Sequence, residues 1–593
     1  MPDDLGYRHH YSMMGVTAHW PRSLICSQDL YKERTNMSNY LTKIGVRARK
    51  TPQTEAIPGR EREMTRNNAG GVAFTADAWI RLERWLLLGS EGSSYYVSET
   101  DLTKQNVANV RAAIAEDGER AVKMSVDISV AGRAPKNDPA LFALALAASS
   151  ADATTRECAL AALPQVARTD THLFQFVAFI DAMRGWGPAL RKAIAHWYTT
   201  KTPIDRLGYQ LVKYQQRGGW SHRDLFRLAH VPMNHAVARW VTGAEYGEHN
   251  VKRYAGKNLL REDHYPALNS ELPVIMQAFE QAKQADETTV IRLIREHGLT
   301  REMIPTEHQK SAAVWEALLE KMPLGAMLRT LGRMGACGLL APFSDAAKLV
   351  TNRLGDRELL RKARVHPIDV LKALLVYQAG RGNKGSLSWT AVPQVVDALN
   401  GAYYQAFQFV PATGKRFFLG IDVSGSMTMG RVAGFAGLTP NMGAAAMAML
   451  IARTEPNHFI GGFATQFVDL KISASDRLDA AMKKCQRNFG GTDTTVAIDY
   501  AQKHKYAVDA FVVITDGETW AGDQHTSQAL ESYRRKMGLE TKLIVINTVA
   551  NRTRITDPTD AGSLDIVGFD TSVPTVMHAF LGGSPEFPEE EAA

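Results

Sequence analysis

The chain has 593 residues, of which 45% are hydrophobic, and carries 69 Lys and Arg against 62 Asp and Glu, a formal net charge of +7. This ordinary composition predicts a globular protein of more than one domain. The 4 cysteines are far apart and form no Cys-x-x-Cys pair, which argues against a secreted disulfide framework and a structural zinc site. They are Cys26, Cys158, Cys337 and Cys485.

No apolar run reaches the roughly 18 residues that a membrane span needs. The polar, His-rich stretch from Met1 to Arg22 does not resemble a signal peptide, so we expect a cytoplasmic protein without a membrane partner. Residues 1–36 show no periodic pattern, and we expect them to be disordered or an upstream extension with Met37 as an alternative start. The acidic residues 584–593 predict a flexible tail.

Helical periodicity dominates residues 37–410. An extended segment is expected at Thr51–Gly59, because two prolines disfavour helix there, and a turn at Asn67–Gly71. Pairs of helices joined by short turns predict an α-solenoid, in which each pair buries its apolar face against its neighbours. The expected helices are 78–88, 139–148, 186–199, 204–216, 272–282, 311–321, 324–334, 343–353, 367–379 and 391–407.

Strands and helices alternate in residues 411–583. This alternation predicts an α/β domain with a doubly wound, Rossmann-like parallel sheet. The expected strands are 416–422, 458–464, 510–515, 542–548 and 564–568, and the expected helices between them include 443–453, 476–487, 494–504 and 525–537.

The first of these strands runs directly into a loop of oxygen-bearing side chains. Asp422, Ser424 and Ser426 are spaced two residues apart, so in an extended loop their side chains point the same way. Oxygen ligands suit a hard cation such as Mg2+, and open α/β sheets bind ligands at the carboxyl ends of their strands. The alternative is a serine-rich turn that caps the next helix and holds no metal.

Two later loops supply more oxygen atoms, from Thr492 after a glycine pair and from Asp516 at the end of the buried strand 510–515. Together with the first loop they resemble the metal-ion-dependent adhesion site of von Willebrand factor A domains. The resemblance implies that Mg2+ or another divalent cation is bound, directly or through water, by Asp422, Ser424, Ser426, Thr492 and Asp516. Such a site normally leaves one coordination position open for a partner's carboxylate. Asp493 and Thr494 are substitutes if Thr492 is misassigned.

Positive charge concentrates in residues 184–230, which have a net charge of +7 from nine basic and two acidic side chains. Lys213 with Arg217 and Arg223 with Arg227 are spaced four apart, so each pair is expected on one helix face, where a phosphate would relieve its repulsion. The alternative is a solvated basic face with the aromatics in the core. The interleaved aromatics are Trp186, Trp197, Tyr198, Tyr209, Tyr214, Trp220 and Phe226.

The same segment resembles the TROVE module of the Ro autoantigen family, through Gly185–Tyr198 and Lys213–Leu225. Shorter matches are Leu88–Tyr96, Met322–Leu324, Leu328–Arg329 and His366–Pro367. The Thr51–Gly59 segment resembles the bacterial branch of the family. The pairing of an α-solenoid with a C-terminal A domain is itself this family's architecture.

The resemblance implies a ring of HEAT-like helical repeats whose ends are bridged by the A domain. Y-like small noncoding RNA would bind the outer basic surface, and single-stranded 3′ ends of misfolded RNA would enter the central hole. The expected function is RNA quality control or processing with an exoribonuclease, such as polynucleotide phosphorylase. By family position the expected RNA contacts are Lys192, His196, Lys213, Arg217, His222 and Arg223, although both histidines could instead be surface or capping residues.

Two other functions compete with RNA binding. An enzyme could use the same carboxylates for metal-assisted phosphoryl chemistry, but Ser424 stands where aspartyl phosphatases place a second acid. A metal-dependent protein-interaction scaffold would rest on the A domain alone and would leave the +7 segment unexplained. We therefore expect a protein that binds RNA and has no catalytic residues.

Overall fold

A computed structural model describes residues 50–89, 99–200, 204–231, 236–242, 272–382, 386–407, 412–432, 437–487, 490–568 and 573–582. The chain from Thr51 onward belongs to one compact unit. The expected extension at 1–36, the alternative start at Met37, part of the Leu88–Tyr96 motif and the acidic tail at 584–593 lie outside these residues.

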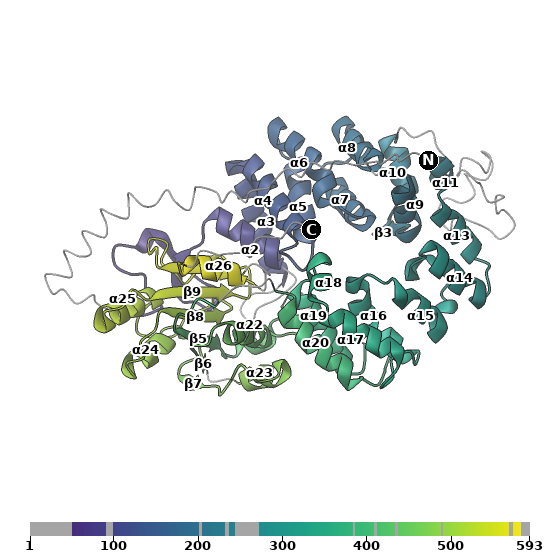
Figure 1. Cartoon of the computed structure of the whole chain (residues 1–593). Helices are drawn as coiled ribbons and strands as arrows, with labels where there is room; N and C mark the ends of the chain where they lie inside the picture. Colours follow the sequence, from purple (N-terminus) through teal and green to yellow (C-terminus); the bar gives the residue numbers. More distant parts are fainter. Residues whose placement is uncertain are drawn as a thin grey trace, which may run out of the picture. The chain divides into compact units, whose positions relative to one another are not determined.

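Helices make up most of the described chain up to residue 407 (Figure 1). None of the described helices is both long and apolar enough to cross a membrane. The helices are α2 (Ala78–Leu88), α3 (Glu99–Glu116), α4 (Gly118–Ala131), α5 (Asp138–Ala148), α6 (Ala153–Val166), α7 (Asp170–Met183), α8 (Pro188–Thr199), α9 (Ile204–Lys213), α10 (His222–Ala229), α11 (Ala236–Thr242), α13 (Val274–Ala282), α14 (Glu287–His297), α15 (Ala312–Glu320), α16 (Leu324–Ala336), α17 (Asp345–Gly355), α18 (Arg357–Lys362), α19 (Pro367–Gln378) and α20 (Pro393–Gln405).

These helices begin and end where local signals place them. The Asp77 carboxylate accepts from the N–H groups of Trp79 and Ile80 at the start of α2, and Gly89 ends that helix with a φ of 67°. Successive helices pack as the solenoid prediction requires, because α4 contacts α2 and α6 while α5 contacts α3 and α7. The helices in this part of the chain thus lie against their next-but-one neighbours, which confirms a region rich in helical repeats.

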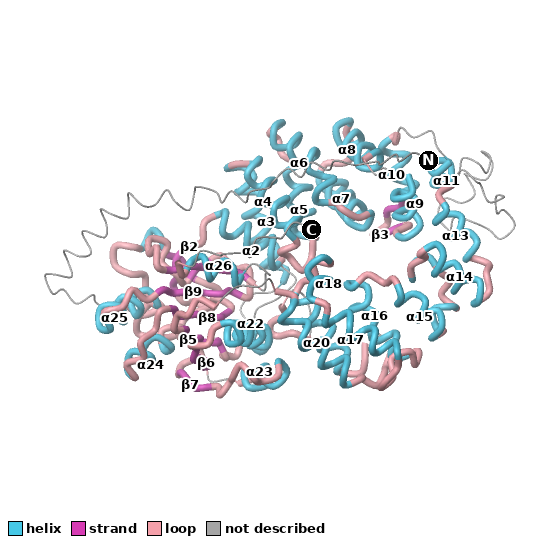
Figure 2. The backbone as a smooth tube through the Cα atoms, in the orientation of Figure 1, coloured by secondary structure: helices cyan, strands magenta, loops and turns pink. Residues whose placement is uncertain are grey.

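The C-terminal domain is built on a six-stranded sheet with the order β11-β9-β8-β5-β6-β7. All neighbours are parallel except β6 and β7. Figure 2 shows most strands, in magenta, gathered in this domain. The strands are β5 (Phe417–Asp422), β6 (His458–Phe463), β7 (Phe467–Asp469), β8 (Ala510–Thr515), β9 (Lys542–Asn547) and β11 (Ser563–Val567).

Helices cover both faces of this sheet, as the doubly wound prediction requires. Phe417 and Leu419 of β5 belong to the core shared with α22, whereas Phe418 belongs to the core shared with α24 and α25. A strand buried on both sides explains the uninterrupted apolar run of its sequence. The helices of the domain are α21 (Ser426–Met429), α22 (Pro440–Thr454), α23 (Leu478–Cys485), α24 (Val496–Lys503), α25 (Thr526–Met537) and α26 (Val573–Phe580).

A small sheet of three strands joins the beginning of the described chain to the C-terminal domain. β1 (Met64–Arg66) and β2 (Val72–Thr75) form a hairpin, and β10 (Thr553–Arg554) pairs antiparallel with β2. The predicted turn at Asn67–Gly71 is therefore confirmed as the hairpin turn. The short strands themselves were not predicted, because two to four residues carry too little alternation to be recognised.

Candidate functional site

The carboxyl ends of β5 and β8, which are neighbours in the sheet, bring the predicted oxygen ligands together. Asp422 is the last residue of β5, and Asp516 directly follows the last residue of β8. Ser424 and Ser426 follow β5, and Thr492 lies in the loop before α24. All five side chains are buried, with at most 2% of the surface of each exposed.

Hydrogen bonds fix the first of these loops. The Asp422 carboxylate accepts from the Ser424 N–H at 2.9 Å and from the Thr515 hydroxyl at 2.6 Å. The hydroxyl oxygens of Ser424 and Ser426 lie 3.0 Å apart. The loop therefore holds its hydroxyl groups side by side, next to a carboxylate that is already anchored.

Two polar atoms of the site have no hydrogen-bond partner, although both are buried: Oγ1 of Thr492 and Oδ2 of Asp516. Burial, and then the negative charge of Asp516, raise the pKa of Asp422, and burial likewise raises the pKa of Asp516. Unpaired buried oxygens and two carboxylates held near each other are costly without a compensating positive charge. The donor set therefore fits a hard divalent cation.

The same geometry decides between Thr492 and its substitutes. Oδ1 of Asp493 accepts from the N–H and the hydroxyl of Thr495 at 2.9 and 2.7 Å. The Thr494 hydroxyl lies 2.5 Å from that of Thr526. Both substitutes are thus engaged elsewhere, whereas the Thr492 hydroxyl is unpartnered. The described residues contain no group of three or more His, Cys, Asp or Glu that could hold a metal, so this mixed hydroxyl–carboxylate site is the candidate.

Residues far away in the sequence also reach this site. Asn68, in the β1–β2 turn, donates two hydrogen bonds to the carboxylate of Glu518, which lies two residues after Asp516. Asn551, in the loop after β9, donates to the backbone carbonyl of Asp516 at 2.8 Å. Sequence reasoning missed both asparagines, since neither lies in a recognisable motif.

The basic segment places its first two expected RNA contacts on the surface. Lys192 and His196 lie four residues apart on α8, and both are exposed. Pro188 occupies the first turn of this helix, where its missing N–H costs nothing. The opposite face of α8 is buried and carries Trp197 and Tyr198, so Lys192 and His196 are presented by a well-packed helix.

The expectation that Lys213 and Arg217 share a helix face is wrong. Helix α9 ends at Lys213, and Arg217 lies on β3 (Gln216–Arg217), which pairs with β4 (Trp220–Ser221). The cause is the glycine pair between these strands, whose φ angles of 59° and 84° form a tight turn. Arg217 is consequently exposed in a hairpin and separated from the helix.

Lys213 is half-buried between two tyrosines. Its Nζ donates to Oη of Tyr209 at 3.0 Å and lies 5.3 Å from the ring centroid of Tyr214. Burial lowers the pKa of Lys213, but the hydrogen bond to Tyr209 and the electrostatic interactions with Tyr209, Tyr214 and Glu302 together outweigh this, and the pKa is raised. The ammonium group therefore remains charged, although it is less available to a ligand than the Arg217 side chain.

His222 lies in the core, and this position does not fit the RNA contact expected for it. Only 4% of its surface is exposed, and its Nδ1 lies 2.8 Å from the hydroxyl of Tyr198. Its ring centroid is 4.7 Å from that of Phe174. Burial lowers the pKa of His222 to about 3, so the ring is neutral and its 3.5 Å contact with Asp170 is not a charged pair.

Arg223 and Arg227 do share one helix, α10, which begins with a capping box formed by Ser221 and Asp224. Arg227 is exposed and Arg223 is half-buried. Burial and the adjacent Arg227 charge lower the pKa of Arg223, which shows the expected mutual repulsion. A bound anion would stabilise this pair.

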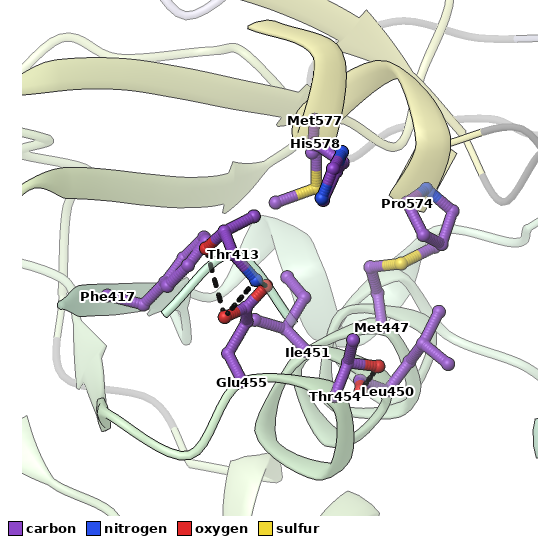
Figure 3. Close-up of a pocket in the computed structure, with 10 residues that line it drawn as sticks. All are labelled: Thr413, Phe417, Met447, Leu450, Ile451, Thr454, Glu455, Pro574, Met577 and His578. Atoms are coloured by element: carbon purple, nitrogen blue, oxygen red, sulfur yellow. Dashed lines mark hydrogen bonds between the residues drawn. The ribbon is translucent and has the colours of Figure 1, made fainter. Parts of the chain in front are cut away.

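A cavity between α22 and α26 is a less convincing site (Figure 3). Its volume is about 20 Å³, room for about one water molecule. Its one carboxylate, Glu455, already accepts from the N–H and the hydroxyl of Thr413. We assign this cavity no ligand.

Comparisons with known proteins all match members of one family. A family model described as the TROVE domain matches residues 65–375, and one described as the Ro60 vWA domain matches residues 416–581. The RNA-binding protein RO60 of Deinococcus radiodurans is 42% identical over 535 residues, which are 90% of this chain and 97% of the relative. The RNA-binding protein RO60 of Caenorhabditis elegans is 33% identical over 589 residues, which cover 87% of this chain and 90% of the relative.

A solved structure agrees with these sequence matches. The crystal structure of the Deinococcus radiodurans RO (RSR) protein has a TM-score of 0.64 and 40% identity to this chain. The match covers 85% of this chain and 99% of that chain, so it extends over both the helical region and the sheet domain.

Proposed function

Because the chain belongs to the RO60 family of TROVE-domain proteins, we propose that it binds RNA through the cationic side chains of residues 184–230. The support from the comparisons is that relatives covering nearly the whole chain are named RNA-binding proteins. The support from physics is the local excess of positive charge, because phosphate contacts supply most sequence-independent affinity for nucleic acids.

The observation that carries this proposal is a set of exposed cations without acidic partners. Lys192, Arg217 and Arg227 are all exposed, and none forms a salt bridge with any residue that the structure describes. Some exposed cations elsewhere on the helices do have a carboxylate within 4 Å, as Lys123 has Asp127 at 2.7 Å. Lys192 and Arg227 on packed helices, and Arg217 on the β3–β4 hairpin, are therefore available for phosphates.

We expect the double variant Lys192→Ala/Arg217→Ala to bind single-stranded RNA about tenfold more weakly at moderate salt, with a salt slope shallower by 1 to 2. Filter-binding titrations at several salt concentrations measure both quantities. The matched control is Lys123→Ala/Arg292→Ala, which removes two exposed cations that are already paired with Asp127 and Glu296. An unchanged slope in the first variant would favour a merely solvated basic face.

The finer parts of the proposal rest on the family resemblance. We propose that a Y-like small RNA occupies the outer basic surface and that misfolded or single-stranded RNA enters through its 3′ end into a central hole of the helical ring. We further propose a link to an exoribonuclease, such as polynucleotide phosphorylase, in RNA quality control in the cytoplasm, without catalysis by this chain. Crosslinking followed by sequencing of copurified RNA tests the choice of ligand.

We also propose that a divalent cation, Mg2+ or a similar ion, is held by Asp422, Ser424, Ser426, Thr492 and Asp516. The support is the pair of unpartnered buried oxygens on Thr492 and Asp516. The bound ion would offset the two carboxylate charges and would offer a position to a partner's carboxylate. The five ligand residues lie on the loops that would contact that partner.

Removal of one carboxylate tests this metal proposal. A hundredfold excess of Mg2+ over its dissociation constant should stabilise the wild-type chain by about 2.7 kcal/mol, visible as a rise in Tm. Asp516→Asn should abolish the rise, while Asp479→Asn, on helix α23 beside Arg477, should retain it. A wild-type Tm that does not respond to Mg2+ or Mn2+ would contradict the proposal.

A further inference from the structure

The segment between Thr51 and Thr75 lies along the C-terminal domain, although that domain begins far later in the chain. Gln53 donates its N–H to the carbonyl of Gly522 at 3.2 Å, and the Asn67 side chain donates to the carbonyl of Thr519 at 2.6 Å. Thr51, Gln53 and Asn67 are all buried, with at most 5% of each exposed. Buried polar side chains with partners on another domain indicate a specific contact.

The contact centres on the loop that follows Asp516. Glu518 is 1% exposed, and its carboxylate accepts from the N–H of Asn68 at 2.8 Å, from the side-chain amide of Asn68 at 2.7 Å and from the N–H of Ala69 at 3.3 Å. A buried carboxylate so close to Asp516 would be very unfavourable without these donors. The β1–β2 turn thus fixes the Glu518 carboxylate through three hydrogen bonds.

Hydrogen bonds from helix α2 also reach the loop that carries Asp516, by way of Asn551. The Arg84 guanidinium donates to Oδ1 of Asn551 at 2.8 Å and to its carbonyl oxygen at 3.1 Å. The Asn551 amide in turn donates to the carbonyl of Asp516 at 2.8 Å. Arg84 and Asn551 are both buried. The loop that carries Asp516 is therefore held between two parts of the N-terminal chain.

We propose that Asn68 and Asn551 are positioning residues of the adhesion site and that the N-terminal segment completes this site from outside its own domain. They direct the Asp516 carboxylate toward the cation and keep the Glu518 carboxylate turned aside. Since the cation and the segment stabilise the same loop conformation, each favours the binding of the other. The site thereby links the metal to the first helices of the RNA-binding region. This inference rests on the proposed cation and is independent of the proposed RNA contacts.

The first test is the Mn2+ affinity of full-length variants, measured by electron paramagnetic resonance. Asn68→Asp keeps the size of the side chain but replaces its donor with a second carboxylate facing Glu518. We expect this variant to weaken Mn2+ binding by about 10- to 100-fold, the usual effect of losing a hydrogen bond that orients the ligands of a metal. The matched control is Arg60→Ala, which breaks another contact between this segment and the C-terminal domain, the 2.6 Å ion pair of Arg60 with Asp557. It should stay close to the wild-type affinity.

The second test needs no substitution in the segment. Hydrogen exchange followed by mass spectrometry should show Mg2+ protecting the amides of residues 64–75 in the wild-type chain but not in Asp516→Asn. Equal Mn2+ affinities for the wild type and Asn68→Asp, or equal losses in Asn68→Asp and Arg60→Ala, would overturn the inference while leaving the metal in place. A wild-type chain without Mn2+ affinity would overturn both the proposed cation site and the inference about the N-terminal segment. RNA binding is measured separately and does not depend on this outcome.

Discussion

Replacing Arg84 with Met should lower the free energy of unfolding by about 3–5 kcal/mol, the cost of leaving one partner of a buried ion pair uncompensated. Arg84 has no exposed surface, and its guanidinium pairs with Asp565 of β11, which is 2% exposed at its side chain. The same guanidinium donates to the carbonyl of Thr553 at 2.7 Å. Met fills a similar volume without replacing any of these hydrogen bonds. Urea denaturation of the full chain measures the loss.

The control for this prediction is a surface pair of the same kind. Arg292 and Glu296 lie 2.9 Å apart on α14, and each side chain is about half exposed. Arg292→Met should cost less than about 1 kcal/mol, because water solvates the remaining carboxylate. A second variant, Arg84→Met/Asp565→Leu, should recover part of the stability, since it removes the unpaired charge. An Arg84→Met variant as stable as Arg292→Met would contradict the buried role of the pair.

The second large effect concerns the pH dependence of stability, through His222. Burial lowers the pKa of His222 to about 3 in the folded chain, against a value near 6.5 in the unfolded chain. Its folded form is therefore neutral, and the stability it contributes is complete above pH 6.5 and is lost as the pH falls from there toward 3. At pH 5 the loss should reach about 2 kcal/mol relative to pH 7.

The variant His222→Gln should remove this loss, so its unfolding free energy should fall by about 2 kcal/mol less than that of the wild type between pH 7 and pH 5. The comparison is made on the change with pH, because the loss of the contact with Tyr198 lowers stability at every pH. The control is His196→Gln, which alters an exposed histidine on α8. Equal pH dependence in the wild type and His222→Gln would show that His222 is not a buried neutral group.

Local patterns predicted much of the C-terminal domain. The strands expected at 416–422 and 510–515 appear as β5 and β8, because each lies between two helical layers and must be apolar throughout. Because β5 and β8 are parallel neighbours in the sheet, their carboxyl ends bring Asp422 and Asp516 to one edge. The placement of the oxygen cluster therefore follows from sequence, although its occupation by a cation stays a prediction.

In the helical region, local patterns did not place every residue correctly. Spacing of four residues places Arg223 and Arg227 together on α10, but it misplaced Arg217, because α9 ends early and a glycine turn begins a hairpin. By family position His222 is expected to contact RNA, whereas the packing of α7 and α8 encloses it. The side on which a polar residue lies depends on the neighbouring helices as well as on its own.

By itself the sequence determined the repeated helices, the parallel sheet, the cluster of oxygen ligands and the surplus of positive charge, since each depends on residues close together in the chain or on a strand's own burial. Only the tertiary structure decided that Asn68 meets Glu518 and that Arg84 pairs with Asp565. The first two are 450 residues apart and the second two 481. No local periodicity records contacts at such separations, because they are selected by the packing of whole domains.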